Sequence, residues 1–137
     1  MRQGPGRGAV IGVLSGLLVT LAAVELAILE CFLLPLRMGS VAAPLSIPAA
    51  VLGNLALPAL AYRLTGSRAA ALLPVLVWFA VVVTASVPRP EGDVIVTGTV
   101  QGMAFLILGA IAGAISVGRV MALRPTDRPS GSDSGDG

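Results

Sequence analysis

Four long apolar stretches alternate with short polar segments along the chain. They run over residues 9–34, 41–62, 69–87 and 94–118, and each is bounded by arginine, proline or aspartate. A helix needs about 20 apolar residues to cross a bilayer, because it rises about 1.5 Å per residue. The pattern therefore predicts four membrane-spanning helices. The connections are short, so consecutive helices should be antiparallel neighbours.

The composition supports lipid as the solvent. The 137 residues are 55% hydrophobic and 12% charged, and the mean hydropathy is +0.93, whereas soluble domains carry about 25% charged residues. A soluble domain of this size could not bury so much apolar surface. The sequence therefore predicts an all-α, four-helix transmembrane domain over residues 9–118. A short polar segment, 1–8, precedes it, and a polar tail, 119–137, follows; the Pro-, Ser- and Gly-rich end of the tail is expected to be disordered.

The arginines predict the orientation. With four spans, seven of them fall on one side of the membrane: Arg2, Arg7, Arg63, Arg68, Arg119, Arg124 and Arg128. Arg37 and Arg89 fall on the other side. Short loops rich in arginine stay in the cytoplasm. We therefore expect a multi-pass protein of the plasma membrane with both termini in the cytoplasm.

Proline and glycine positions predict breaks between and within the helices. The second stretch holds Pro44, Pro48 and Pro58, so its helix should start late, kink, or both. Gly66 and Ser67 lie between the second and third stretches. They predict a turn whose serine caps the next helix.

Two glutamates fall inside the first stretch. Glu25 lies just beyond its middle and Glu30 near its outer end. A charged side chain at the centre of a membrane costs about 2.5–3.5 kcal/mol, so we expect Glu25 to face the other helices. Five residues correspond to about 140° around a helix, so the two carboxyl groups should not share a face. Polar residues expected at similar depth could hydrogen-bond Glu25; they are Asn54, Thr84, Ser86 and Gln101.

The outer loops hold the remaining charges. We expect Glu30 to form an ion pair with Arg37 or Arg89 at the outer surface. Glu91 and Asp93 could bind a cation weakly, and solvation of loop charges explains them equally well. For Glu25, one interpretation is an ion-coupling or substrate-binding carboxylate. The other is a structural hydrogen bond or a contact with a partner subunit.

Small residues recur at helical spacing in two stripes. Gly8, Gly12 and Gly16 lie on the first predicted helix, and Gly109 and Gly113 on the fourth. Glycines four residues apart let helix backbones approach closely in lipid. Both stripes belong to the cytoplasmic half, so we expect them to pack on each other. A seam between two copies of the chain is the alternative.

One tryptophan, Trp78, falls in the middle of the third stretch. Tryptophans of membrane proteins are enriched at the two interfaces, so this position is unusual. The side chain could line a cavity, but the pattern favours the filling of a gap between helices.

The sequence lacks the residues that most enzymatic sites require. It contains no histidine, no lysine and one cysteine, Cys31, so a disulfide within the chain is impossible. Phosphate-binding loops, metal-ligand spacings and nucleophile triads are absent. We therefore expect no enzymatic activity, no cofactor and no metal. The net charge of +2 is small and scattered, which disfavours nucleic acid as a partner.

Three short segments carry a resemblance to a known family. They are Leu33-Leu34-Pro35-Leu36-Arg37, Gly53-Asn54-Leu55-Ala56-Leu57-Pro58 and Pro88-Arg89-Pro90-Glu91-Gly92-Asp93. In these segments the chain resembles a family of small uncharacterised integral membrane proteins of high-GC Gram-positive bacteria. The resemblance covers about two thirds of the chain. It implies four spans and contributes no catalytic residue.

Two functions compete. Small size and the glycine stripes favour an accessory or structural subunit of a membrane assembly, whose partners would be lipid and another membrane protein or a second copy. The alternative is a proton-coupled small-molecule transporter using Glu25. In size and in this carboxylate the chain looks like the small multidrug resistance family. The local sequence Ala23-Val24-Glu25-Leu26-Ala27 is not a close match, and the arginine bias argues against insertion in both orientations.

Overall fold

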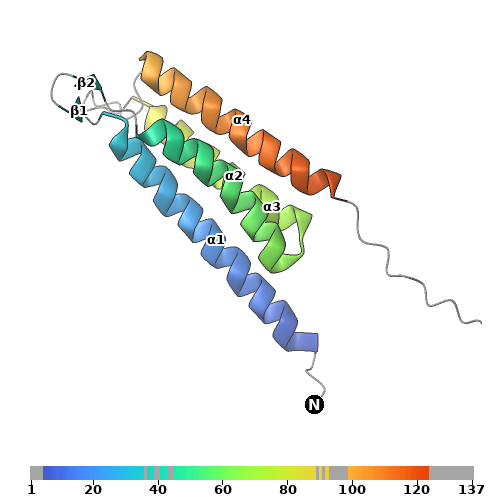
Figure 1. The fold of residues 1–137 in the computed structure, drawn as a ribbon. Coiled ribbons are helices and arrows are strands. Elements are labelled where there is room, and N and C mark those ends of the chain that lie inside the picture. Colours follow the sequence, from blue (N-terminus) through green and yellow to red (C-terminus); the bar gives the residue numbers. More distant parts are fainter. Residues whose placement is uncertain are drawn as a thin grey trace, which may run out of the picture.

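The fold is a bundle of four helices with a short hairpin at one end (Figure 1). The structure is a computed structural model and describes residues 5–35, 37–38, 41–42, 45–88, 90, 92 and 99–123. Its elements are α1 (Pro5–Leu33), β1 (Arg37–Met38), β2 (Val41–Ala42), α2 (Ser46–Thr65), α3 (Arg68–Ser86) and α4 (Val100–Ala122). The strands are antiparallel, with Arg37 opposite Ala42 and Met38 opposite Val41.

In the part of the chain that the structure describes, all four helices are long and apolar enough to cross a membrane, as the sequence predicted. Large apolar side chains cover their outer faces; examples are Leu18, Leu52, Leu76 and Ile107. In water, an exposed apolar surface of this extent would drive aggregation. Lipid tails solvate it, so the packing of the bundle is consistent with a multi-pass membrane protein.

The second and fourth helices begin later than the apolar stretches. α2 starts at Ser46 because the two strands of the hairpin precede it, which confirms the expected late start. Pro48 falls in the first turn of α2, where a backbone N–H would have no partner within the helix, so its absence costs no hydrogen bond. α4 starts at Val100, and the Thr99 hydroxyl accepts the N–H of Gly102 at 3.2 Å. Residues 94–98 of the predicted fourth stretch lie outside the described residues.

The connection between α2 and α3 is a tight turn with two caps. Gly66 ends α2 with a left-handed backbone (φ 67°), and its N–H donates to the Tyr62 carbonyl at 2.8 Å. A glycine suits this position because a side chain would strain it. Ser67 then caps α3 by accepting the N–H of Ala70 at 3.4 Å. The turn predicted at Gly66-Ser67 is confirmed.

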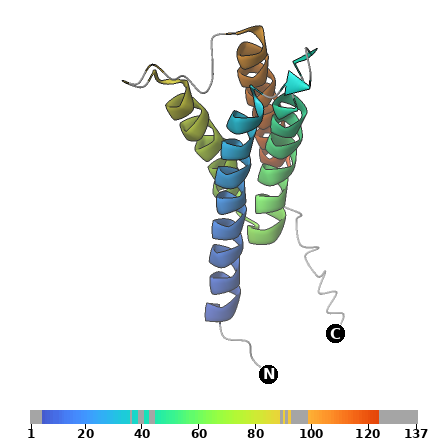
Figure 2. The same ribbon diagram turned by 90° about the vertical axis from the view of Figure 1, so that its left-hand side faces the viewer.

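α2 and α3 form the centre of the bundle, with α1 and α4 on either side of them. In the described residues α1 packs on α2 and α3, α4 packs on the same two helices, and no Cα atom of α1 comes within 8 Å of one in α4. Figure 2 shows α1 between α2 and α3. The N-terminal end of α1, the α2–α3 turn and the C-terminal end of α4 lie at the same end of the bundle (Figure 1). There the Arg68 guanidinium donates to the Leu123 carbonyl, which joins the turn to the end of α4.

This arrangement contradicts the expected packing of the two glycine stripes on each other. The stripes belong to α1 and α4, whose described backbones do not approach within 8 Å between Cα atoms. Gly109 and Gly113 of α4 instead approach α3, where Trp78 and Val75 fill the space. The glycine stripe of α1 faces the α2–α3 turn. Of its three glycines, Gly16 lies closest to another helix, since a Cβ atom added there would be 3.5 Å from the methyl group of Thr65.

Candidate functional site in the bundle core

The buried core lies toward the hairpin end and contains a carboxyl group. Ala27 and Cys31 of α1 and Leu34, which follows it, belong to this core, together with Ala50, Trp78, Val82 and Phe105 from the other helices. Glu30 falls on the same face of α1, and its side chain is 0% exposed. Burial of a carboxyl group in an apolar core is costly unless it is hydrogen-bonded. The partners of Glu30 therefore define the site.

Trp78 of α3 supplies the hydrogen bond to Glu30. Its indole N–H donates to Oε2 at 2.7 Å, and both side chains are buried. An ion pair of Glu30 with Arg37 or Arg89 at the outer surface was expected from the sequence, whereas the structure buries the Glu30 side chain among the helices. Arg89 and the side chain of Arg37 lie outside the described residues.

A glycine of α4 makes room for the indole ring of this pair. A Cβ atom at Gly109 of α4 would lie 2.5 Å from Cζ2 of Trp78, so the indole ring occupies space that a side chain would need. At Gly53 of α2 a Cβ atom would collide with Leu26 of α1, and Oε1 of Glu30 would lie 3.4 Å from it. The ring of Trp78 also contacts Phe105, with centroids 5.5 Å apart. Trp78 therefore fills a gap between helices, as its position in the sequence predicted.

Asn54 of α2 joins the same cluster. It is buried, and its Nδ2 atom would lie 3.4 Å from a Cβ at Gly109, the position that the Trp78 ring also approaches. Among the described residues, Asn54 Nδ2 and Glu30 Oε1 have no hydrogen-bond partner. The core thus holds a carboxyl, an indole and a carboxamide from three different helices. Two of their polar atoms remain open to a ligand or to rearrangement.

A second polar contact ties α4 to α2. The Ser116 hydroxyl donates to the Leu55 carbonyl at 2.8 Å, and Ser116 is buried. Pro58 lies inside α2 and has no N–H to donate to the carbonyl one turn before it, that of Asn54. Ser116 therefore adds a hydrogen bond beside the point where the proline interrupts the helical ladder.

Glu25 faces away from the bundle, contrary to the expectation from its depth. Its side chain is exposed, while Ala23 and Ala27 on either side of it are buried. The hydrogen bonds expected for it are not made: the hydroxyls of Thr84 and Ser86 donate to carbonyls of their own helix, at 2.7 Å each. Glu25 and Glu30 do lie on different faces of α1, as predicted from their spacing.

The remaining candidates have simpler positions. Gln101 is half-buried in the first turn of α4. Glu91 and Asp93 lie outside the described residues, so the suggested weak cation site falls there too. In the part of the chain that the structure describes, no group of three or more acidic or cysteine side chains could hold a metal ion.

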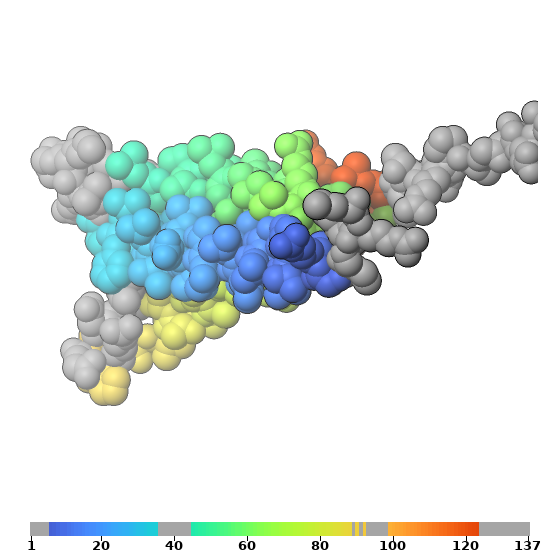
Figure 3. All heavy atoms as spheres, turned by 90° about the horizontal axis from the view of Figure 1, so that it is seen from below, coloured from blue at the N-terminus to red at the C-terminus, as the bar shows by residue number. Residues whose placement is uncertain are grey.

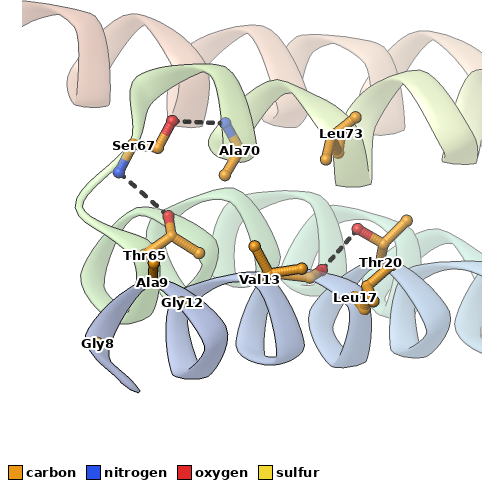
Figure 4. A pocket seen from close by; sticks show the side chains of 11 residues that line it. Gly8, Ala9, Gly12, Val13, Leu17, Thr20, Thr65, Ser67, Ala70 and Leu73 are labelled. Atoms are coloured by element: carbon orange, nitrogen blue, oxygen red, sulfur yellow. Dashed lines mark hydrogen bonds between the residues drawn. The ribbon is translucent and has the colours of Figure 1, made fainter. Parts of the chain in front are cut away.

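A groove separates the glycine stripe of α1 from the α2–α3 turn (Figure 4). Its volume is about 640 Å³, and Gly8, Gly12 and Gly16 form one wall. Thr65 and Ala70 belong to the opposite wall. The residues that line the groove are mostly apolar. The hydroxyl of Thr20, which also lines it, donates to the Gly16 carbonyl at 2.8 Å. The glycines thus line a groove on the bundle side of α1.

One signal in the sequence could have located the Glu30 site. A tryptophan in the middle of a span, away from the interfaces, needs an acceptor for its N–H when buried. Trp78 has this position, and Glu30 is an acceptor on a helix that runs parallel to α3.

Comparison with protein-family models, with curated proteins and with solved structures gives no match.

Proposed function

We propose that the chain is a non-enzymatic subunit of an assembly in the plasma membrane, with both termini in the cytoplasm. The orientation is supported by Arg7, Arg63, Arg68 and Arg119, which belong to the same end of the bundle. Arginine-rich ends of spans remain in the cytoplasm. The family resemblance is compatible with this role and adds no activity.

The observation that carries the proposal is the outward position of Glu25. Gly16 lies beside Thr65, the last residue of α2, and Glu25 is nine residues further along α1. At about 1.5 Å per residue this is about 14 Å, and Leu33 at the other end of α1 is about 12 Å away. Glu25 therefore lies deep within the apolar section of the bundle.

A glutamate at this depth gains little from the lipid around it. Its side chain is too short to reach either interface, whereas long side chains near helix ends can do so. Exposure of a charged group there costs about 2.5–3.5 kcal/mol. A neighbouring transmembrane helix that hydrogen-bonds Glu25 would remove this cost. The outward carboxyl group therefore supports a partner on this face of α1.

The test is the composition of the particle that contains the chain in native membranes. We expect the tagged full-length chain, extracted in a mild detergent, to elute as a complex larger than the monomer. Glu25→Leu should shift it toward the monomer, and Leu52→Ala, at an exposed position of α2, should not. A lone monomer of the unaltered chain would contradict the proposal.

The alternative remains a proton-coupled transporter using Glu25. Because Glu25 faces outward, the carboxyl group would have to line a space between this chain and a neighbouring one. Substrate flux or toxin resistance that depends on the chain and disappears in Glu25→Gln would favour this alternative. Assembly without any such activity would leave the subunit role as the better description.

A further inference from the structure

The outer face of α1 carries a regular pattern that the packing of the bundle does not use. The side chains that follow it alternate in steps of three and four; they are Ile11, Leu14, Leu18, Leu21, Glu25, Ile28 and Phe32. We call this set the outer seam. Its six apolar members are 42–67% exposed. In Figure 3 the outer side of α1 forms a continuous blue band along one face of the molecule.

Alternating steps of three and four define a heptad repeat. Such a repeat keeps one edge of a helix against a partner helix that crosses it at about 20°. The outer seam covers three heptads, from Ile11 to Phe32, without an interruption. The faces used inside the bundle lie elsewhere: Gly16 is nine residues from Glu25, which places it about 180° away.

We propose that two copies of the chain pair through their outer seams, with the α1 helices parallel and a two-fold axis along the membrane normal. This inference rests on the proposed function, since it identifies the partner of the assembly as a second copy. The pairing is isologous, so each seam residue approaches its own equivalent in the other copy. Packing then resembles that of a coiled coil.

The identity of the partner follows from Glu25. Copies of one chain insert in the same orientation, so both Glu25 side chains lie at the same depth. On a two-fold axis they meet each other, and a carboxyl group that carries a proton donates its O–H to the oxygen of the other. Each glutamate thus obtains the polar partner that lipid does not provide. A different helix would need a polar group at this one depth.

The polar position also makes the pairing specific. A single polar residue within an apolar heptad fixes the register of two helices, because any shift would leave it unpaired. Among the helices that the structure describes, Glu25 is the one exposed acidic side chain. The exposed faces of α2, α3 and α4 offer no equivalent acidic group. The outer seam is therefore the face that a second copy of the chain fits.

Disulfide cross-linking in native membranes tests the geometry. Leu18 on the seam and Leu52 on α2 are matched positions, because both are leucines that are 67% exposed. In a Cys31→Ala background, we expect Leu18→Cys to form a covalent dimer under oxidation and Leu52→Cys to remain monomeric. Equal cross-linking of the two variants, or none at Leu18→Cys, would overturn the proposal that two copies pair through the outer seam.

Energy transfer between labelled copies in lipid vesicles tests the role of Glu25. We expect the unaltered chain to self-associate, and Glu25→Leu to raise the dissociation constant by about 3- to 30-fold, the range for interhelical hydrogen bonds in membranes. Glu25→Gln keeps a donor and an acceptor and should stay within about threefold. Leu52→Ala should leave the constant unchanged. Unaltered association of Glu25→Leu would overturn the inference that the two Glu25 carboxyl groups bind each other.

The two proposals fail in different ways. If the chain is monomeric in vesicles while its complex in native membranes persists and contains a different protein, pairing through the outer seam is overturned and the subunit role stands. If the chain is monomeric in both settings, both proposals fall. A dimer in vesicles that Glu25→Leu weakens, together with cross-linking at Leu18→Cys, supports both.

Discussion

The indole N–H of Trp78 binds the buried carboxyl group of Glu30 at 2.7 Å, and this bond joins α3 to α1 inside the core. The two residues are 48 positions apart in sequence. Gly109 accommodates the indole ring from the side of α4, so a third helix depends on the same pair. The polar core therefore contributes to holding the helices together as well as to satisfying a buried acid.

Removal of the Trp78 donor should destabilise the bundle. Trp78→Phe leaves a buried carboxyl oxygen without its partner, which costs about 1–3 kcal/mol. We expect this loss in the free energy of unfolding, measured by titration with a denaturing detergent in mixed micelles. Leu76→Ala, at an exposed position of the same helix, should change it by less than about 0.5 kcal/mol.

A double-mutant cycle separates the hydrogen bond from the packing of the indole ring. If Trp78 acts through Glu30, the effects of Trp78→Phe and Glu30→Leu should not add, and their coupling should be about 0.5–3 kcal/mol. Strictly additive effects would show that the bond contributes nothing to stability and that the ring matters only for its volume.

Gly109 should tolerate a methyl group much less well than another glycine of the same helix. In Gly109→Ala the new Cβ would lie 2.5 Å from the ring of Trp78, and overpacking of this kind costs about 1–3 kcal/mol. At Gly118 nothing lies within 4 Å, so Gly118→Ala should be neutral or slightly stabilising. Thermal unfolding of both variants in the same detergent provides the comparison, and equal melting temperatures would contradict the packing of Trp78 against α4.

The Ser116 hydroxyl should stabilise the contact between α4 and α2. Ser116→Ala removes its bond to the Leu55 carbonyl beside Pro58, and a hydrogen bond of this kind contributes about 0.5–1.5 kcal/mol. Thr84→Val is a control, since the Thr84 hydroxyl donates within its own helix and its side chain is exposed. We expect detergent unfolding to shift for Ser116→Ala by more than for Thr84→Val.

The proposed orientation predicts the accessibility of two connections. In a Cys31→Ala background, Gly92→Cys should react with a membrane-impermeant maleimide added to intact cells, because the connection between α3 and α4 faces outward. Ser67→Cys, in the turn between α2 and α3, should react only after the cells are opened. The reverse labelling pattern would place the arginine-rich end outside and contradict the proposed topology.

The number of helices could be predicted from the sequence because length and hydropathy determine what crosses a bilayer. The turn at Gly66 and Ser67 was also predictable, since glycine suits the left-handed end of a helix and serine suits the N-cap of the next one. The prolines predicted that α2 would start late, but hydropathy did not show that Val41 and Ala42 at the start of the second apolar stretch form a strand.

The inward faces of the helices were harder to predict. In water, the buried side of a helix is apolar and its exposed side polar, so the pattern reveals its orientation. In lipid both sides of α1 are apolar, and depth alone suggested that Glu25 was the buried acid and Glu30 the interfacial one. The structure instead buries Glu30 among the helices and leaves Glu25 exposed on the outer face of α1. The heptad of the outer seam was visible in the sequence, but nothing local assigns it to the outside.

The separation of α1 from α4 has a consequence for biogenesis. Among the described helices, the backbone of α1 comes close only to α2 and α3, so the first three spans can reach their final arrangement while the remainder of the chain is still being synthesised. Trp78 is then already available to bind Glu30 before the last span is inserted. Glu30 thereby obtains its hydrogen-bond partner early, and α4 is added to a scaffold that is already in place.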